Sequence, residues 1–207
     1  DGTAEPWAIR TKLLRKLRTE EFRNQVVDAE PDGHVLVIGE PQCPDGYPRL
    51  PGAREEAVEV ARALSAQGGG ASLGVETLIS DHPREPGPDE FSVVSTLLKR
   101  DWRLIHVAGH GALGSEDGKP GGVVLSEGNF LGPNEIKAMR QVPELVFINC
   151  CHLGAFGNAR VLKAASTSSS GSYDRVKFAA GLAEELIKIG VRCVIAAGWA
   201  VNDDAAK

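Results

Sequence analysis

Two apolar segments of this chain each end in a side chain that could take part in nucleophilic catalysis. Residues 146–148 run into Cys150 and Cys151, and residues 104–108 run into His110. If both segments are parallel strands of an open α/β sheet, their carboxyl ends lie at the edge where such sheets bind ligands. A thiol and an imidazole at that edge predict a nucleophile and its base.

The two adjacent thiols are expected to have different roles. Side chains alternate along a strand, so Cys150 and Cys151 should face opposite sides of the sheet. Cys151 precedes Gly154 by three residues, where we expect the strand to break into a loop, and this position favours Cys151 as the nucleophile. Cys150 is predicted to be a small core residue, as free cysteines often are. A neighbouring imidazole would raise the thiolate fraction of a thiol whose ordinary pKa is about 8.5.

The two histidines of the first segment are also expected to differ. His106 lies within the predicted strand, and we expect it to be buried, hydrogen-bonded and supporting. His110 stands between Gly109 and Gly111, which predicts a turn and an uncrowded ring that can act as a general base. The backbone N–H groups of Gly111 and Cys151 are the predicted donors of an oxyanion hole.

Other chemistries fit these residues less well. Residues 109–114 match G-x-G-x-x-G, but residues 115–122 are too rich in glycine and proline to open the helix that a dinucleotide site requires. A zinc site is disfavoured because its histidines would lie on a strand and its loop rather than on one helix face. Its ligands would come from His106, His110, Cys150, Cys151 and His152. We therefore expect neither a metal nor a cofactor. The remaining alternative is that the His and the Cys are ordinary core residues. It is disfavoured because both stand at matching strand ends and are flanked by glycines.

A third apolar segment, residues 191–197, also runs into residues that suit a binding site. Gly198 and Trp199 follow it directly, and Asp203 and Asp204 come soon after. We expect this stretch to form a wall of the substrate pocket, with Gly198 giving access to a peptide backbone. A carboxylate there would favour a basic side chain in the substrate.

Hydrophobic periodicity predicts the elements that position these residues. Strands are expected at 34–39, 75–79, 104–110, 145–149 and 191–197, and a hairpin at 123–131. Helices are expected at 54–67, 89–102, 133–140 and 176–189, and loops at 114–122 and 164–174. Strands separated by helices indicate an α/β fold with a mostly parallel central sheet and helices on both faces.

Residues 5–29 read as a basic amphipathic helix, so residues 1–30 are treated as an N-terminal helix or linker from a preceding domain, and residues 31–207 as the main domain. The single methionine is Met139, and the chain ends without a helix-ending signal. We therefore expect a piece of a larger polypeptide that is incomplete at its C-terminus.

Composition excludes several classes of protein. A net charge of −5 argues against nucleic acid as the main partner. No apolar run is long enough to span a bilayer, and the charged start is not a secretory signal. The four cysteines do not form a disulfide framework, which is typical of reduced thiols in a cytoplasmic protein.

Four short motifs occur together in this chain. They are His106 to Gly111 (H-x-x-x-H-G), Asn149 to Gly154, Trp199 to Asp203 (W-x-V-x-D) and Leu50 to Ala57 (LPGA…EA). Together they resemble a CHAT domain, a branch of the caspase-like cysteine peptidases that includes relatives of separase, and the resemblance covers residues 34–204. The resemblance implies a caspase-like three-layer sandwich, with His110 catalytic and Cys151 the nucleophile. By similarity to separase, Asp203 or Asp204 would contact a basic residue on the acyl side of the scissile bond.

The expected function is that of a cysteine endopeptidase that cleaves a protein or peptide substrate through a thioester, with a Cys151–His110 dyad. His106, Asn149 and Cys150 would support it. The family often places TPR repeats or other sensor domains before the peptidase, so a flanking domain or partner is expected to regulate activity. Loops 111–122 and 155–175 would be movable walls. The alternative is a catalytically silent caspase-like module that binds a partner.

Overall fold

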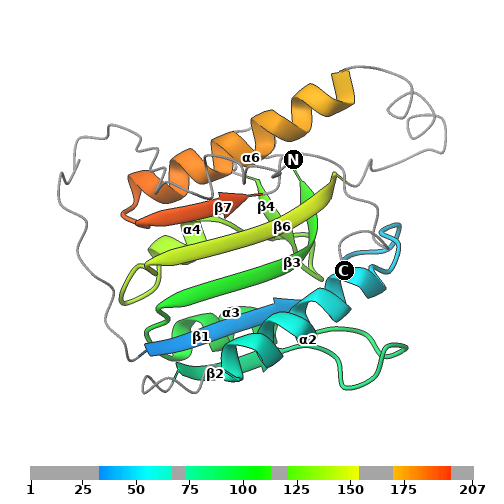
Figure 1. Cartoon of the computed structure of the whole chain (residues 1–207). Helices are drawn as coiled ribbons and strands as arrows, with labels where there is room; N and C mark the ends of the chain where they lie inside the picture. Colours follow the sequence, from blue (N-terminus) through cyan, green and yellow to red (C-terminus); the bar gives the residue numbers. More distant parts are fainter. Residues whose placement is uncertain (1–32, 67–72, 113–120, 154–169, 197–207) are drawn as a thin grey trace, which may run out of the picture.

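The computed structural model describes residues 33–66, 73–112, 121–153 and 170–196, and only the backbone of residues 151–153 and 170–178. A sheet of seven strands forms its centre (Figure 1). The strands are β1 (Gly33–Gly39), β2 (Leu73–Leu78), β3 (Leu104–Ala112), β4 (Gly122–Val124), β5 (Phe130–Leu131), β6 (Leu145–Leu153) and β7 (Cys193–Ala196). The helices are α2 (Pro51–Ser65), α3 (Glu90–Lys99), α4 (Pro133–Lys137) and α6 (Ser170–Lys188).

The sheet is mostly parallel, as the sequence predicts. Strands β2, β1, β3, β6 and β7 lie side by side in that order, and every neighbouring pair is parallel. Strand β4 runs antiparallel to the end of β3, beyond the point where β1 stops, and pairs with β5 as the expected hairpin. The carboxyl ends of β1, β3 and β6 therefore meet at one edge of the sheet.

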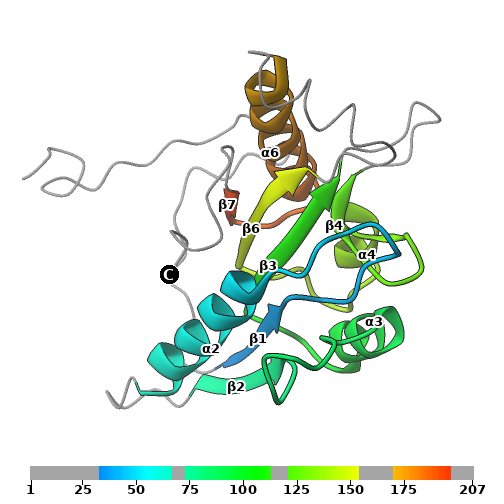
Figure 2. The same cartoon turned by 90° about the vertical axis from the view of Figure 1, so that its right-hand side faces the viewer.

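Helices cover both faces of this sheet, which makes a three-layer sandwich (Figures 1 and 2). Helix α2 packs on one face, where Ala57 and Ala61 meet Val35 and Val37 of β1. Helices α3, α4 and α6 cover the other face. The larger core cluster there includes Leu36, Ile38, Val93, Leu97, Trp102, Ile105, Val107, Ile136, Val146, Ile148, Cys150, Leu182 and Leu186. This arrangement confirms the predicted α/β sandwich.

Local sequence explains where helices α2 and α3 begin. Helix α2 begins at Pro51, three residues before the expected start, because proline suits the first helical position, where no intrahelical N–H bond is needed. Helix α3 begins after Asp89, whose carboxylate accepts a hydrogen bond from Ser92 N at 2.8 Å. The helix ends at Lys99 rather than at residue 102. Beyond that end, Trp102 turns back and donates its indole N–H to Leu97 O at 3.0 Å.

The close contact between α2 and β1 depends on a glycine. A Cβ at Gly39 would lie 2.5 Å from the Cβ of Ala57. Since no two carbon atoms pack at that distance, only glycine allows the helix to approach the end of β1. The loop that leads from β1 into α2 therefore starts directly after this close contact.

The expected ends of three elements are wrong. Strand β3 continues through His110 to Ala112, because β4 and β6 both pair with its last residues, so there is no turn at His110. Strand β6 continues to Leu153 and does not break at Cys151. Helix α6 begins at Ser170, inside the expected loop 164–174. The expected helix 5–29 lies outside the described residues.

Within the described ranges, no helix combines the length and the apolar character needed to cross a membrane.

Candidate active site

Strands β3 and β6 bring the two predicted catalytic residues onto adjacent strands. Ala108 pairs with Asn149, and two residues later on β3, His110 pairs with His152, three residues later on β6. Strand β6 therefore has one extra residue in this interval, a β-bulge at Cys150–Cys151. Such bulges disrupt the ladder locally and re-aim side chains, often next to active sites. The backbone of Cys151 thus lies on the strand beside His110, one residue before its partner.

His110 is buried, with 3% of its surface exposed, so the expected uncrowded ring is wrong. Its Nε2 lies 2.7 Å from the carbonyl oxygen of Pro48, and its ring packs against the Tyr47 ring at a centroid distance of 4.9 Å. A carbonyl oxygen can only accept, so Nε2–H is the donor. In the neutral ring the lone pair then belongs to Nδ1, which is the nitrogen able to take up a proton.

His106 and Asn149 contact one buried carboxylate on the face that α2 covers. Glu56 of α2 has Oε1 at 3.2 Å from His106 Nε2, and its Oε2 accepts a hydrogen bond from Asn149 Nδ2 at 2.6 Å. The His106 ring also stacks on Phe147 at 4.9 Å, with an interplanar angle of 29°. Glu56 therefore joins β3 to β6 directly before the bulge.

The cysteines occupy different environments. Cys150 is 3% exposed and belongs to the core cluster on the face opposite α2. Cys43, in the loop after β1, has its Sγ at 3.5 Å from Pro41 O and 3.6 Å from Val124 O. Burial, and next the charge of Glu40, raise the pKa of the Cys43 thiol to about 11. Cys43 therefore stays protonated at neutral pH and is a poor nucleophile. The side chain of Cys151 lies outside the described residues.

The remaining predicted site residues are only partly described. Gly111 lies in β3 and pairs with Val123 of β4 and Leu153 of β6, and its role as an oxyanion donor stays a prediction. Gly198, Trp199, Asp203 and Asp204 lie outside the described residues. Among the residues that are described, no three His, Cys, Asp or Glu side chains gather closely enough to hold a metal ion.

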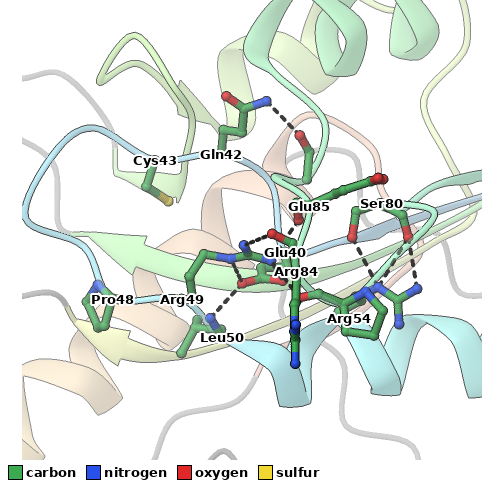
Figure 3. Close-up of polar contacts among 12 residues, drawn as sticks. Glu40, Gln42, Cys43, Pro48, Arg49, Leu50, Arg54, Ser80, Arg84 and Glu85 are labelled. Carbon is green, nitrogen blue, oxygen red and sulfur yellow. Dashed lines mark hydrogen bonds and ion pairs between the residues drawn. The ribbon is translucent and has the colours of Figure 1, made fainter.

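The structure adds two site residues that sequence reasoning missed. Glu56 could have been found, because it follows Ala53 by three residues and precedes Val60 by four, which places a carboxylate on the apolar stripe of its helix. Pro48 left no signal, since it contributes a backbone carbonyl from the loop between β1 and α2. Figure 3 shows this loop, with Pro48, Arg49 and Leu50 beside Glu40.

Among protein-family models, that of the CHAT domain matches residues 8–207. Neither the curated proteins nor the solved structures gave a match. CHAT domains are caspase-like and are associated with cysteine-peptidase-like domains. The parallel sheet with helices on both faces agrees with that fold. Since the match spans nearly all of the 207 residues, the chain belongs to the CHAT-domain family.

Proposed function

We propose that this chain is a cysteine endopeptidase in which Cys151 is the nucleophile and His110 is the base. The observation that supports the proposal is the state of His110. Its Nε2–H is committed to Pro48 O at 2.7 Å, so Nδ1 is left as the proton-accepting nitrogen, on the strand beside the one that carries Cys151. A base held in one tautomer by a second group is what activation of a thiol requires.

In the first half of the reaction, the Sγ of Cys151 attacks the carbonyl carbon of the scissile peptide bond. Nδ1 of His110 takes the thiol proton and passes it to the leaving amine. The C–N bond breaks, the amine product departs, and the acyl group remains on sulfur as a thioester. The N–H groups of Gly111 and Cys151 would stabilise the negative oxygen that develops.

In the second half, a water molecule attacks the thioester carbon while His110 accepts its proton. The C–S bond breaks, the acyl product leaves as a carboxylic acid, and the proton returns to the thiolate. The Pro48 carbonyl would stabilise the imidazolium in both halves, because it accepts a hydrogen bond from Nε2–H throughout.

The proposed substrate is a protein or peptide segment with a basic residue on the acyl side of the scissile bond. Asp203 or Asp204 would pair with that residue, and Gly198 and Trp199 would line the pocket. A flanking sensor domain or a partner would regulate access to the site. These residues and partners are carried over from the resemblance to CHAT domains and separase.

The test is a peptide-library cleavage assay on the full-length protein with a matched set of cysteine variants. We expect cleavage after basic residues, its loss in Cys151→Ala, and its retention in Cys43→Ala, whose thiol is the protonated one. A thiol-directed probe should label Cys151, as located by mass spectrometry. Loss of cleavage in Cys150→Ala with retention in Cys151→Ala would reverse the assignment. An unlabelled, inactive protein would indicate a partner-binding module instead.

A further inference from the structure

The carbonyl that holds His110 belongs to an irregular loop, so another part of the protein must fix its direction. Pro48 is exposed and lies in no helix or strand. The loop leaves β1 at Glu40 and enters α2 at Pro51. A carbonyl in such a loop can rotate unless the peptide unit that contains it is held. The Pro48 carbonyl shares its planar peptide unit with the N–H of Arg49, so holding Arg49 orients this carbonyl.

Glu40 anchors the start of the loop to the strand that carries His110. It is 6% exposed, and its backbone N–H donates to Ala108 O at 2.9 Å, two residues before His110. Its φ is 49°, in the left-handed region that non-glycine residues rarely adopt. Such a conformation persists where the surroundings over-determine it, and it is often found at functional sites.

The carboxylate of Glu40 then holds the two residues that follow Pro48. Its Oε1 accepts hydrogen bonds from Leu50 N at 2.8 Å and from Arg49 Nε. Its Oε2 accepts one from Arg49 Nη2 at 2.9 Å (Figure 3). The bidentate contact suits the planar fork of a guanidinium, which a lysine does not reproduce. Arg49 is therefore bound to Glu40, which is itself hydrogen-bonded to β3.

The Arg49 guanidinium is also held by the loop that follows β2. Nη2 donates to Glu85 O at 2.9 Å and Pro83 O at 3.3 Å, and Nη1 donates to Arg84 O at 3.5 Å. This loop approaches Glu40 closely, because a Cβ at Gly87 would lie 1.8 Å from Glu40 O. Contacts from two separate loops therefore limit the movement of Arg49.

We propose that Glu40 and Arg49 act as positioning residues that orient the Pro48 carbonyl and thereby hold His110 in the tautomer protonated at Nε2. In this proposal the Glu40–Arg49 pair acts through the Pro48 carbonyl. This proposal rests on the proposed function only in that a correctly held imidazole serves as the base. The tautomer itself is a property of the folded protein and can be measured without any substrate.

The test uses Arg49→Lys, with Glu40→Gln as a second variant that keeps the shape of the buried side chain. Arg62→Lys is the matched control, because Arg62 also contacts a glutamate through Nε and Nη2, both to Glu59 Oε2, on the exposed side of α2. The ¹⁵N chemical shifts of the His110 ring report its tautomer directly. We expect Nε2–H in the unmodified protein and in Arg62→Lys, and a mixture of both tautomers in Arg49→Lys and Glu40→Gln.

Peptide cleavage gives the second readout. We expect kcat to fall about 10-fold to 100-fold in Arg49→Lys, as for a misplaced catalytic group, with a nearly unchanged KM. An unchanged His110 tautomer in both Arg49→Lys and Glu40→Gln would overturn the proposal. If the tautomer shifts as expected but the unmodified protein cleaves no peptide, the role of the Glu40–Arg49 pair stands and the proposed peptidase function fails.

Discussion

Replacing Glu56 provides a sharp stability test, because helix α2 carries a matched control one turn away. Glu56 is 12% exposed at its side chain and contacts His106, whose side chain is 8% exposed, and Asn149. Glu59 on the same helix pairs with Arg62 on the outer surface, and the two side chains are 64% and 70% exposed. Truncating each carboxylate to alanine compares a buried contact with an exposed one at nearly equal helix propensity.

The magnitude follows from the two contacts that Glu56→Ala removes. A hydrogen bond to a charged group contributes about 1.5–3 kcal/mol, and a buried polar group that loses its partner costs about 1–3 kcal/mol. Glu56→Ala removes both the bond from Asn149 and the contact with His106, so we expect a total cost of about 2–4 kcal/mol. For a chain of this size that loss lowers Tm by about 5–15 °C.

The assay is unfolding by urea and by heat, followed by far-UV circular dichroism at pH 7.5. We expect Glu56→Ala to unfold well before the unmodified protein, Glu56→Gln to lie between them because its amide oxygen can still accept from Asn149, and Glu59→Ala to unfold with the unmodified protein. Equal losses of stability in Glu56→Ala and Glu59→Ala would refute the idea that the buried carboxylate joins β3 to β6.

Three further predictions concern the fold around the site. Gly39→Ala should lower the free energy of unfolding by about 1–3 kcal/mol, because its Cβ would meet Ala57. Gly181→Ala should raise it by about 0.5–1 kcal/mol, because a Cβ there would meet nothing within 4 Å. Chemical denaturation of both variants measures the two changes. The pKa of Cys43 is raised to about 11 from an ordinary 9.0, so the folded protein keeps a proton that the unfolded chain loses. The free energy of unfolding is therefore unaffected below pH 9 and falls between pH 9 and 11. Unfolding midpoints across this range should decline less steeply in Cys43→Ala. Trp102→Phe removes the indole donor to Leu97 O and should cost about 1–2 kcal/mol, measured by thermal unfolding, and a change of less than 0.5 kcal/mol (about a third of one such bond) would contradict it.

Where hydrophobic runs are long and bounded by turn residues, the sequence predicts the structure well. Residues 35–38 are fully buried in β1, as expected for a strand covered on both faces. The order of strands and helices, the parallel sheet and the hairpin 123–131 follow from the same patterns. The predicted ends of β3 and β6 are wrong, because strand length there depends on pairing with partners distant in the chain, which a local pattern does not contain.

The sequence by itself determined which residues could do chemistry and which elements would carry them. The apolar runs before His110 and Cys151 required buried strands, and the four motifs pointed to the CHAT family that the match over residues 8–207 confirms. These properties are local or compositional, so they can be read from neighbouring residues. The roles of the two residues stay predictions that the variants above test.

Only the tertiary structure decided how His110 is held. Its partner is the carbonyl of Pro48, 62 residues earlier in the chain. Every amino acid has the same backbone carbonyl, so the residue types of the sequence do not indicate this contact. The same is true of the bulge at Cys150–Cys151, which arises from the register between β3 and β6, and of the contact of Glu56 with His106 and Asn149. The physical reason is that a tautomer, a register and the contacts of a buried carboxylate are set by atoms brought together across the fold.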